Sequence, residues 1–140
     1  MKLRYGFFLV ILVILVILVT GCGKNSLKCV YESDSNDSVV NMKFNKDGII
    51  FLKEKDVQKY SDDDAYVEMF YYEQVDKFVE IDNVSGIKYD IKKRNSNVYT
   101  NVNIDYKALG EYDSDIIIVD KNNDYDSSKS IFEDLGYSCK

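Results

Sequence analysis

The residues of this chain with the most definite chemistry are its three cysteines, Cys22, Cys29 and Cys139. A thiol can be acylated, can join a second thiol in a disulfide, or can act as a nucleophile beside a base. The chain contains no histidine. A Ser-His or Cys-His nucleophile is therefore excluded, and the commonest zinc ligand is missing as well. Acylation and disulfide formation are the roles that remain.

Cys22 follows a short basic start and a continuous apolar run. Lys2 and Arg4 precede the 13 apolar residues 7–19 (FFLVILVILVILV), and two small residues separate that run from the cysteine. This order is typical of a secretory signal with its cleavage site. The segment 19–22 (VTGC) resembles the lipobox of bacterial lipoproteins. The resemblance implies that residues 1–21 are removed and that the Cys22 sulfur carries a diacylglycerol.

The same apolar run could instead cross the bilayer uncleaved. A spanning helix needs about 20 apolar residues, and residues 7–19 supply 13. We therefore expect a lipoprotein signal peptide at 1–21, a lipid-anchored tether at 22–26 and one domain at 27–140. The domain is expected on the extracytoplasmic face of the cell membrane.

The expected mature chain is acidic. Lys2 and Arg4 are the only charged residues before Cys22, so 16 basic and 24 acidic residues remain, a net charge of −8. Such a chain is repelled by nucleic acid and by anionic headgroups. We expect no nucleic-acid partner, and a membrane contact made through the diacylglycerol on Cys22.

Cys29 and Cys139 are the two cysteines that remain once Cys22 is assigned to the lipid. Outside the cytoplasm such a pair indicates a disulfide, here between the start and the end of the domain. The alternative is two free thiols, because many monoderm bacteria form few secreted disulfides.

The elements that must position these residues follow from local patterns. Alternating apolar and polar residues on either side of an Asp-Gly turn at 47–48 predict the early strands. Apolar residues three and four positions apart predict one long helix. A second hairpin follows, and after it a short helix that residues 126–128 (DSS) are expected to cap and Gly136 to end. The expected strands are 27–33, 39–45, 49–59, 87–92 and 98–106, and the expected helices are 65–79 and 126–135.

These elements define an α+β fold, an antiparallel sheet of about 4–5 strands with one long and one short helix packed on it. Residues 61–64 (SDDD) are expected to cap the long helix and stabilise its dipole. Residues 107–114 are expected to be irregular or one helical turn. Residues 116–119 (IIIV) could be a short strand or a buried connector.

Three surface clusters are candidate sites. Residues 120–124 (DKNND) match the opening of a calcium loop, but Tyr125 and Ile131 stand where that motif needs Gly and Glu. A solvated loop explains them, so we expect no metal and no cofactor. Tyr72 and Tyr99 are the candidates for a contact patch. The densest basic patch is expected to keep the sheet soluble and consists of Lys88, Lys92, Lys93 and Arg94.

Cys22, the segment 27–29 (LKC) and the ending 136–140 (GYSCK) together carry a resemblance across the mature domain. The chain resembles small uncharacterised lipoproteins of Firmicutes, YehR-like in layout. The resemblance implies a lipid on Cys22 and a Cys29–Cys139 pair, and it transfers no activity. Here the stretch between the last long strand and the last helix is shorter than in such proteins.

These observations predict a membrane-anchored, non-enzymatic binding or interaction module with an unknown protein or small-molecule ligand. One alternative is a metal- or small-ligand-binding lipoprotein that serves transport or sensing, which an acid-lined pocket would favour. The other is a hydrolase that uses carboxylates alone, which two convergent carboxylates in a deep cleft would favour.

Overall fold

The computed structural model describes residues 24–60, 64–111 and 117–140. The expected signal peptide, the lipid attachment at Cys22 and the helix start at 61–63 lie outside these residues. The described elements are β1 (Ser26–Glu32), β2 (Asn36–Asn45), β3 (Gly48–Lys59), α2 (Asp64–Val79), β4 (Ile87–Arg94), β5 (Asn97–Asp105), α3 (Tyr106–Leu109), α4 (Tyr125–Asp134) and β6 (Ser138–Cys139).

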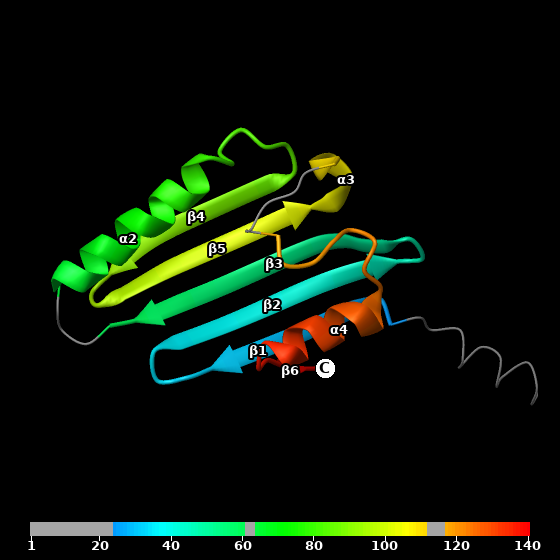
Figure 1. Ribbon diagram of the computed structural model, residues 1–140, viewed down its shortest axis with the longest axis horizontal. Helices are drawn as coiled ribbons and strands as arrows, with labels where there is room; N and C mark the ends of the chain where they lie inside the picture. Colours follow the sequence, from blue (N-terminus) through cyan, green and yellow to red (C-terminus); the bar gives the residue numbers. More distant parts are fainter. Residues whose placement is uncertain (1–23, 61–63, 112–116) are drawn as a thin grey trace, which may run out of the picture.

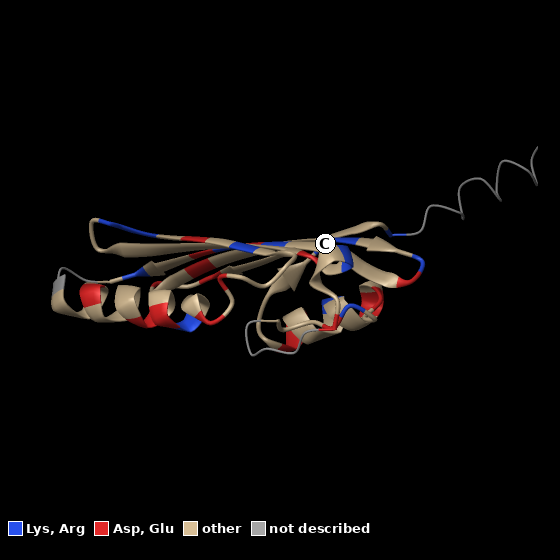
Figure 2. Ribbon diagram, turned by 90° about the horizontal axis from the view of Figure 1, so that it is seen from above, with Lys and Arg blue, Asp and Glu red and all other residues tan. Residues whose placement is uncertain are grey.

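The strands form one antiparallel sheet in the order β4-β5-β3-β2-β1-β6 (Figure 1). Figure 2 shows that α2 and α4 lie on the same side of this sheet, which leaves the opposite face open. Helix α2 packs over β4 and β5, and α4 packs over β1 and β6. The central strands β2 and β3 therefore run between the two helices.

The core lies between the sheet and the helices because strand alternation sends the apolar residues to that side. Helix α2 contributes Val67 and Phe78, and α4 contributes Phe132; each is at most 4% exposed. Full burial of such a side chain stabilises the fold by about 1.5–3 kcal/mol. The sheet contributes Leu27, Cys29, Val40, Met42, Phe44, Ile49, Leu52, Ile87, Val98, Val102 and Ile104.

The turn between β2 and β3 packs against the loop that precedes α4. Gly48 has a φ of +127°, and a Cβ there would lie 2.1 Å from the carbonyl oxygen of Lys121. The same oxygen accepts a hydrogen bond of 3.0 Å from the Ile49 amide. Only glycine fits this turn, because any side chain would push the loop away.

The sheet is larger than the expected four to five strands. The sixth strand, β6, has two residues and pairs Cys139 with Cys29 and Ser138 with Val30. Two residues are too few to give an alternating pattern, so only the pairing with β1 defines this strand.

The described residues contain three helices: the expected long and short helices, and α3, which is the single turn expected as one alternative near residues 107–114. Helix α3 is a single turn, where Asp105 caps the chain by accepting 3.0 Å from the Lys107 amide. Helix α4 is capped by Asp124, which accepts 2.8 Å from the Ser127 amide, and not by the segment 126–128. No helix of the described residues is long and apolar enough to cross a membrane.

Of the segment 116–119, the described residues 117–119 form a connector and not a strand, with Ile117 half-buried and Ile118 exposed. Val119 is fully buried, and the Tyr106 hydroxyl donates 3.0 Å to its carbonyl oxygen. Burial and the charge of Asp120 raise the pKa of Tyr106 well above its usual value, so this hydroxyl keeps its proton.

Candidate functional site

A pair of carboxylates lies on the helix-bearing face of the central strand β3. Glu54 and Asp56 continue the inward row that begins with the buried Leu52. Glu54 is opposite Val40 on β2 and Val102 on β5. Since residues two apart on a strand share a face, the two carboxylates lie side by side on the inner face of the sheet.

Small hydroxyl residues lie on both sides of Asp56. Ser38 on β2 and Thr100 on β5 are its direct cross-strand neighbours, and they are 1% and 7% exposed. The Ser38 hydroxyl donates 3.5 Å to Oε1 of Glu54. The inner face of the sheet is therefore polar across its centre, at the gap between α2 and α4. Ser38, Glu54, Asp56 and Thr100 form this polar strip.

This polar strip opens into a small cavity beside α2. Its volume is about 190 Å³. Ligand pockets for drug-sized molecules have about 300–1,000 Å³, so the cavity fits an ion or a small charged group. The lining consists of Glu54, Asp56, Gln74, Lys77, Phe78, Thr100, Val102 and Ile118.

Burial raises the pKa of both carboxyl groups. For Glu54 desolvation is the largest cause, the charge of Asp56 adds to it, and the Ser38 hydroxyl and Lys77 oppose it. For Asp56 desolvation again dominates, the hydrogen bonding of Asn36 opposes it, and Asp37 adds to it. The fold therefore holds two carboxylates where their charge is costly, which is typical of functional sites.

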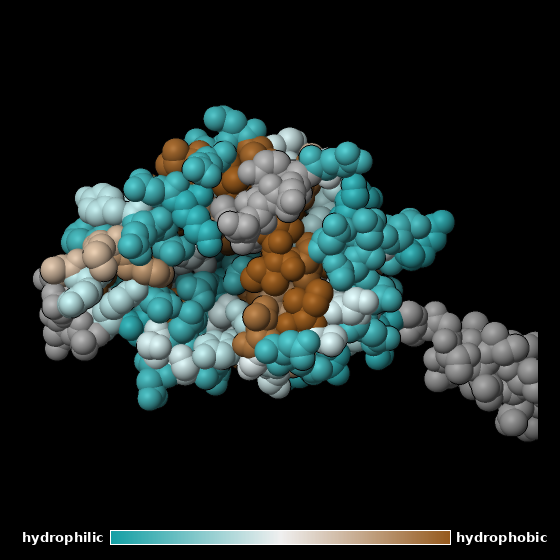
Figure 3. Space-filling view, viewed as in Figure 1, coloured by the Kyte–Doolittle hydropathy of each residue, from teal (hydrophilic) through white to brown (hydrophobic). Residues whose placement is uncertain are grey.

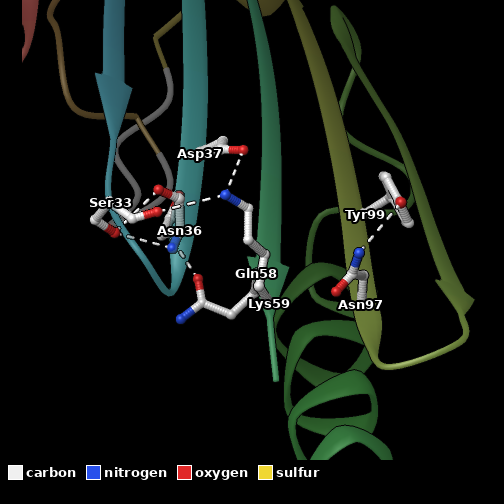
Figure 4. Close-up of polar contacts among 7 residues, drawn as sticks. All are labelled: Ser33, Asn36, Asp37, Gln58, Lys59, Asn97 and Tyr99. Carbon is white, nitrogen blue, oxygen red and sulfur yellow. Dashed lines mark hydrogen bonds and ion pairs between the residues drawn. The ribbon is translucent and has the colours of Figure 1, made fainter. Parts of the chain in front are cut away.

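The strip continues to the ends of β2 and β3, where Figure 4 shows the polar contacts. On the inner face, Nδ2 of Asn36 donates 2.8 Å to Oε1 of Gln58, and on the open face at the same strand ends Lys59 pairs with Asp37 at 2.7 Å. Oδ1 of Asn36 is buried and has no hydrogen-bond partner among the described residues. Such an orphaned acceptor beside Asp56 is costly unless a further donor or cation reaches it.

On the α4 side, the strip ends at Tyr137. Its ring packs against Phe132 and Tyr31, with centroids 5.2 and 5.4 Å away. Burial is the main cause that raises the pKa of Tyr137; the charges of Glu54 and Asp56 add to it, and a hydrogen bond with Ser38 opposes it. This tyrosine is therefore neutral at physiological pH.

A larger hollow of about 600 Å³ lies between α3 and the connector. Tyr106, Leu109 and Glu111 line one side, and Ile117 and Ile118 line the other. The chain between Glu111 and Ile117 lies outside the described residues. In Figure 3 apolar surface is visible at the centre of the helix-bearing face, and Ile118 and Leu135 are 45% and 52% exposed.

The structure separates the predicted contact patch. Tyr72 is 61% exposed on the outer side of α2. Tyr99 lies on the open face of the sheet, between the inward Val98 and Thr100, and accepts 3.5 Å from Asn97. The two tyrosines are on opposite sides of the molecule, so they do not form one patch.

The basic patch is also divided. Lys88, Lys92 and Arg94 lie on the open face, where Lys92 pairs with Asp90 at 2.7 Å. Lys93 is on the helix side and pairs with Glu68 of α2.

The acids of the calcium-like segment are used locally. Asp120 accepts 2.8 Å from the Asn122 amide, and Asp124 caps α4. Within the described part of the chain, no group of three or more Cys, Asp or Glu residues is arranged to hold a metal.

The expected disulfide is present. Cys29 and Cys139 are directly opposite on β1 and β6, with their Cα atoms 4.1 Å apart. Lys28 and Lys140 exchange two backbone hydrogen bonds of 3.0 and 2.9 Å beside them. The cysteines thus occupy the closely spaced, non-hydrogen-bonded position of the ladder.

Glu54 and Asp56 are not among the candidate residues that the sequence indicates, because residues 49–59 are expected only as a strand. The available signal is their spacing of two after Leu52, which places all three side chains on one face of that strand. Cross-strand register was needed to show Ser38 and Thr100 beside them.

The fold resembles that of known structures. The NMR structure of the YehR protein of Escherichia coli superimposes with a TM-score of 0.60 at 12% identity, over 84% of this chain and 92% of that one. A protein of Streptococcus pneumoniae TIGR4 matches with a TM-score of 0.49 at 14% identity, over 81% and 84%. The expected YehR-like layout is thus supported as a fold. No protein-family model and no curated protein matches the sequence.

The raised pKa of Glu54 gives a prediction about pH. A carboxyl group whose pKa is raised by folding binds more protons in the folded state, so stability falls as pH rises from about 4.5 through the folded pKa. Glu54→Gln removes that loss. We expect the variant to be more stable than the wild type at pH 7, by about 1.4 kcal/mol for each unit of pKa elevation.

Urea unfolding between about pH 4.5 and 7.5 measures this effect. Glu80→Gln is the matched control, because Glu80 is an exposed acid outside the strip. A Glu54→Gln variant with the same pH slope as the wild type would contradict the burial of this charge.

Proposed function

We propose that this chain is a lipid-anchored extracytoplasmic binding module that takes a small cation in the cavity over Glu54 and Asp56. The anchor is the diacylglycerol on Cys22, and the domain is non-enzymatic. The observation that carries the proposal is the side-by-side placement of two half-buried carboxylates with raised pKa at the wall of a cavity. A cation would restore the favourable interactions that these groups lose on leaving water.

The donors around the cavity support a hard, oxygen-binding cation or a primary ammonium group. Carboxylate, hydroxyl and amide oxygens are the ligands that Ca²⁺ and Mg²⁺ prefer. An ammonium group donates three hydrogen bonds, which matches several acceptors in a small space. Lys77 lies in the same lining and supplies the one fixed positive charge there.

The size of the cavity favours binding over hydrolysis by carboxylates. A carboxylate pair in a glycosidase must flank a scissile bond and, in inverting enzymes, a water molecule. A space of about 190 Å³ shared by eight lining residues leaves little room for a sugar ring and that water.

Thermal unfolding of the full chain with added cation tests the proposal. CaCl₂, MgCl₂ and methylammonium chloride are compared with NaCl at equal ionic strength. One of the three cations is expected to raise the midpoint temperature of unfolding by several degrees, because a ligand at about 100 times its Kd adds about 2.7 kcal/mol to the free energy of unfolding.

Glu54→Gln and Asp56→Asn should each abolish the rise, and Glu80→Gln should keep it. A rise of the same size in the double variant Glu54→Gln/Asp56→Asn would overturn the site, as would the absence of a rise with all three cations.

A further inference from the structure

The open face of the sheet carries a row of alternating lysines and asparagines. Register places one residue from each of five neighbouring strands on this row: Lys28, Asn41, Lys53, Asn103 and Lys88. None of these lysines forms an ion pair with a described residue. No acid interrupts the row, so its positive charge is uncompensated.

The remainder of this face extends the same charge. Eight basic side chains are directed to it: Lys28, Lys43, Lys53, Lys55, Lys59, Lys88, Lys92 and Arg94. Four acidic ones accompany them: Glu32, Asp37, Asp90 and Asp105. Two of the acids are already paired, Asp37 with Lys59 and Asp90 with Lys92.

The helix-bearing side has the opposite sign. Figure 2 shows red acidic segments concentrated on the helices and blue basic segments on the sheet. The net charge of −8 expected for residues 22–140 is therefore unevenly distributed, because the open face of the sheet is basic and the helix-bearing side is acidic. Such a charge distribution orients a molecule in the field of any charged surface.

We call the open face of the sheet, which carries these eight basic side chains, the lysine face. We infer that the lysine face lies against an anionic bilayer, in contact with its headgroup phosphates. The inference uses the anchor of the proposed function but not its cation site. Between the acylated Cys22 and β1 there are three residues, which span at most about 10 Å. The start of β1, with Lys28 on it, therefore stays near the range of about 8 Å over which charges interact at physiological salt.

The surface chemistry favours headgroup contact without insertion. Apart from the lysines and asparagines, the central part of the face presents Val30, Val39 and Phe51, all half-buried. No large apolar side chain among the described residues of this face is prominently exposed. Lysine stems can reach phosphates while asparagine amides bond to headgroup oxygens.

The orientation has a functional result. With the sheet against the bilayer, α2 and α4 lie on the far side, and the cavity over Glu54 and Asp56 opens away from the membrane. Anionic lipid would otherwise compete with those carboxylates for the same cations.

Lysine modification in vesicles tests this contact. Full-length protein purified from membranes is reconstituted into phosphatidylcholine vesicles or into equimolar phosphatidylcholine and phosphatidylglycerol, and then acetylated and analysed by mass spectrometry. We expect Lys28, Lys53 and Lys88 to react roughly threefold more slowly in the anionic vesicles. Lys77 and Lys129, on the helix side, are internal controls and should react equally in both.

The protection should disappear at 1 M salt, where the screening length is about 3 Å. Equal reactivity of Lys53 in both vesicles would overturn the inference, as would protection by soluble polyphosphate with none by the vesicles. Protein that floats with neither vesicle would instead refute the anchor. The two failures are therefore distinguishable.

Discussion

Replacement of Cys29 and Cys139 by serine is expected to lower the free energy of unfolding by about 2–5 kcal/mol. The disulfide joins residues 110 positions apart, so its loss frees nearly the whole domain in the unfolded state. It also holds β6, whose two residues form too short a ladder to stay paired unaided. Without it, Tyr137 loses its fixed place beside Phe132.

Urea unfolding of the double variant and of the wild type, with and without reductant, measures the loss. Cys29 is fully buried, so a serine there adds the cost of an unpaired hydroxyl. Reduced wild type separates this cost from that of the lost crosslink. Equal midpoints for oxidised and reduced wild type would show that the bridge does not stabilise the fold.

Cys22→Ser is expected to remove nearly all of the protein from the membrane fraction. Stable anchoring takes two acyl chains or one chain with a second signal, and a diacylglycerol supplies both chains through one sulfur. A serine hydroxyl cannot form that thioether. Fractionation of expressing cells and the intact mass of the product measure the result, with Cys139→Ser as the control that retains Cys22.

Two outcomes would contradict this expectation. A Cys22→Ser chain that is still cut and acylated would place the lipid elsewhere. Wild-type protein that stays in the membrane with no added glyceride would instead support the uncleaved helix over residues 7–19.

The elements with strong local patterns were predictable. The helix expected at 65–79 is α2, Asp64–Val79, and the hairpin expected at 87–92 and 98–106 is β4 and β5. Helix α2 keeps one period over 16 residues, and β4 and β5 keep theirs over eight and nine, so local preference and tertiary burial agree. The α+β class followed from their order.

The remaining features depend on partners distant in sequence. Strand β6 exists only beside β1, and Asp124 rather than Asp126 caps α4 because the cap lies two residues earlier in the chain. Glu54 lies in a strand whose sequence alone does not tell which face is covered. Register with Ser38 and Thr100 was needed to recognise the strip.

The lysine face also depends on strand pairing that local sequence patterns do not reveal. The sequence gives basic residues along several strands, and its overall charge argues against an anionic surface as a partner. Only the pairing of β1, β2, β3, β5 and β4 brings Lys28, Lys53 and Lys88 into one row. Net charge is a property of the chain, whereas attraction to a surface is a property of one face.

The bridge between the first and last strands makes the domain a covalently closed ring from Cys29 to Cys139. A protease that cuts this ring once, in any exposed loop, leaves both fragments joined through the sulfur atoms. Release of a fragment from the proposed anchor on Cys22 then requires either a second cut or a reductant. An anchored domain with this topology resists shedding even after it has been nicked.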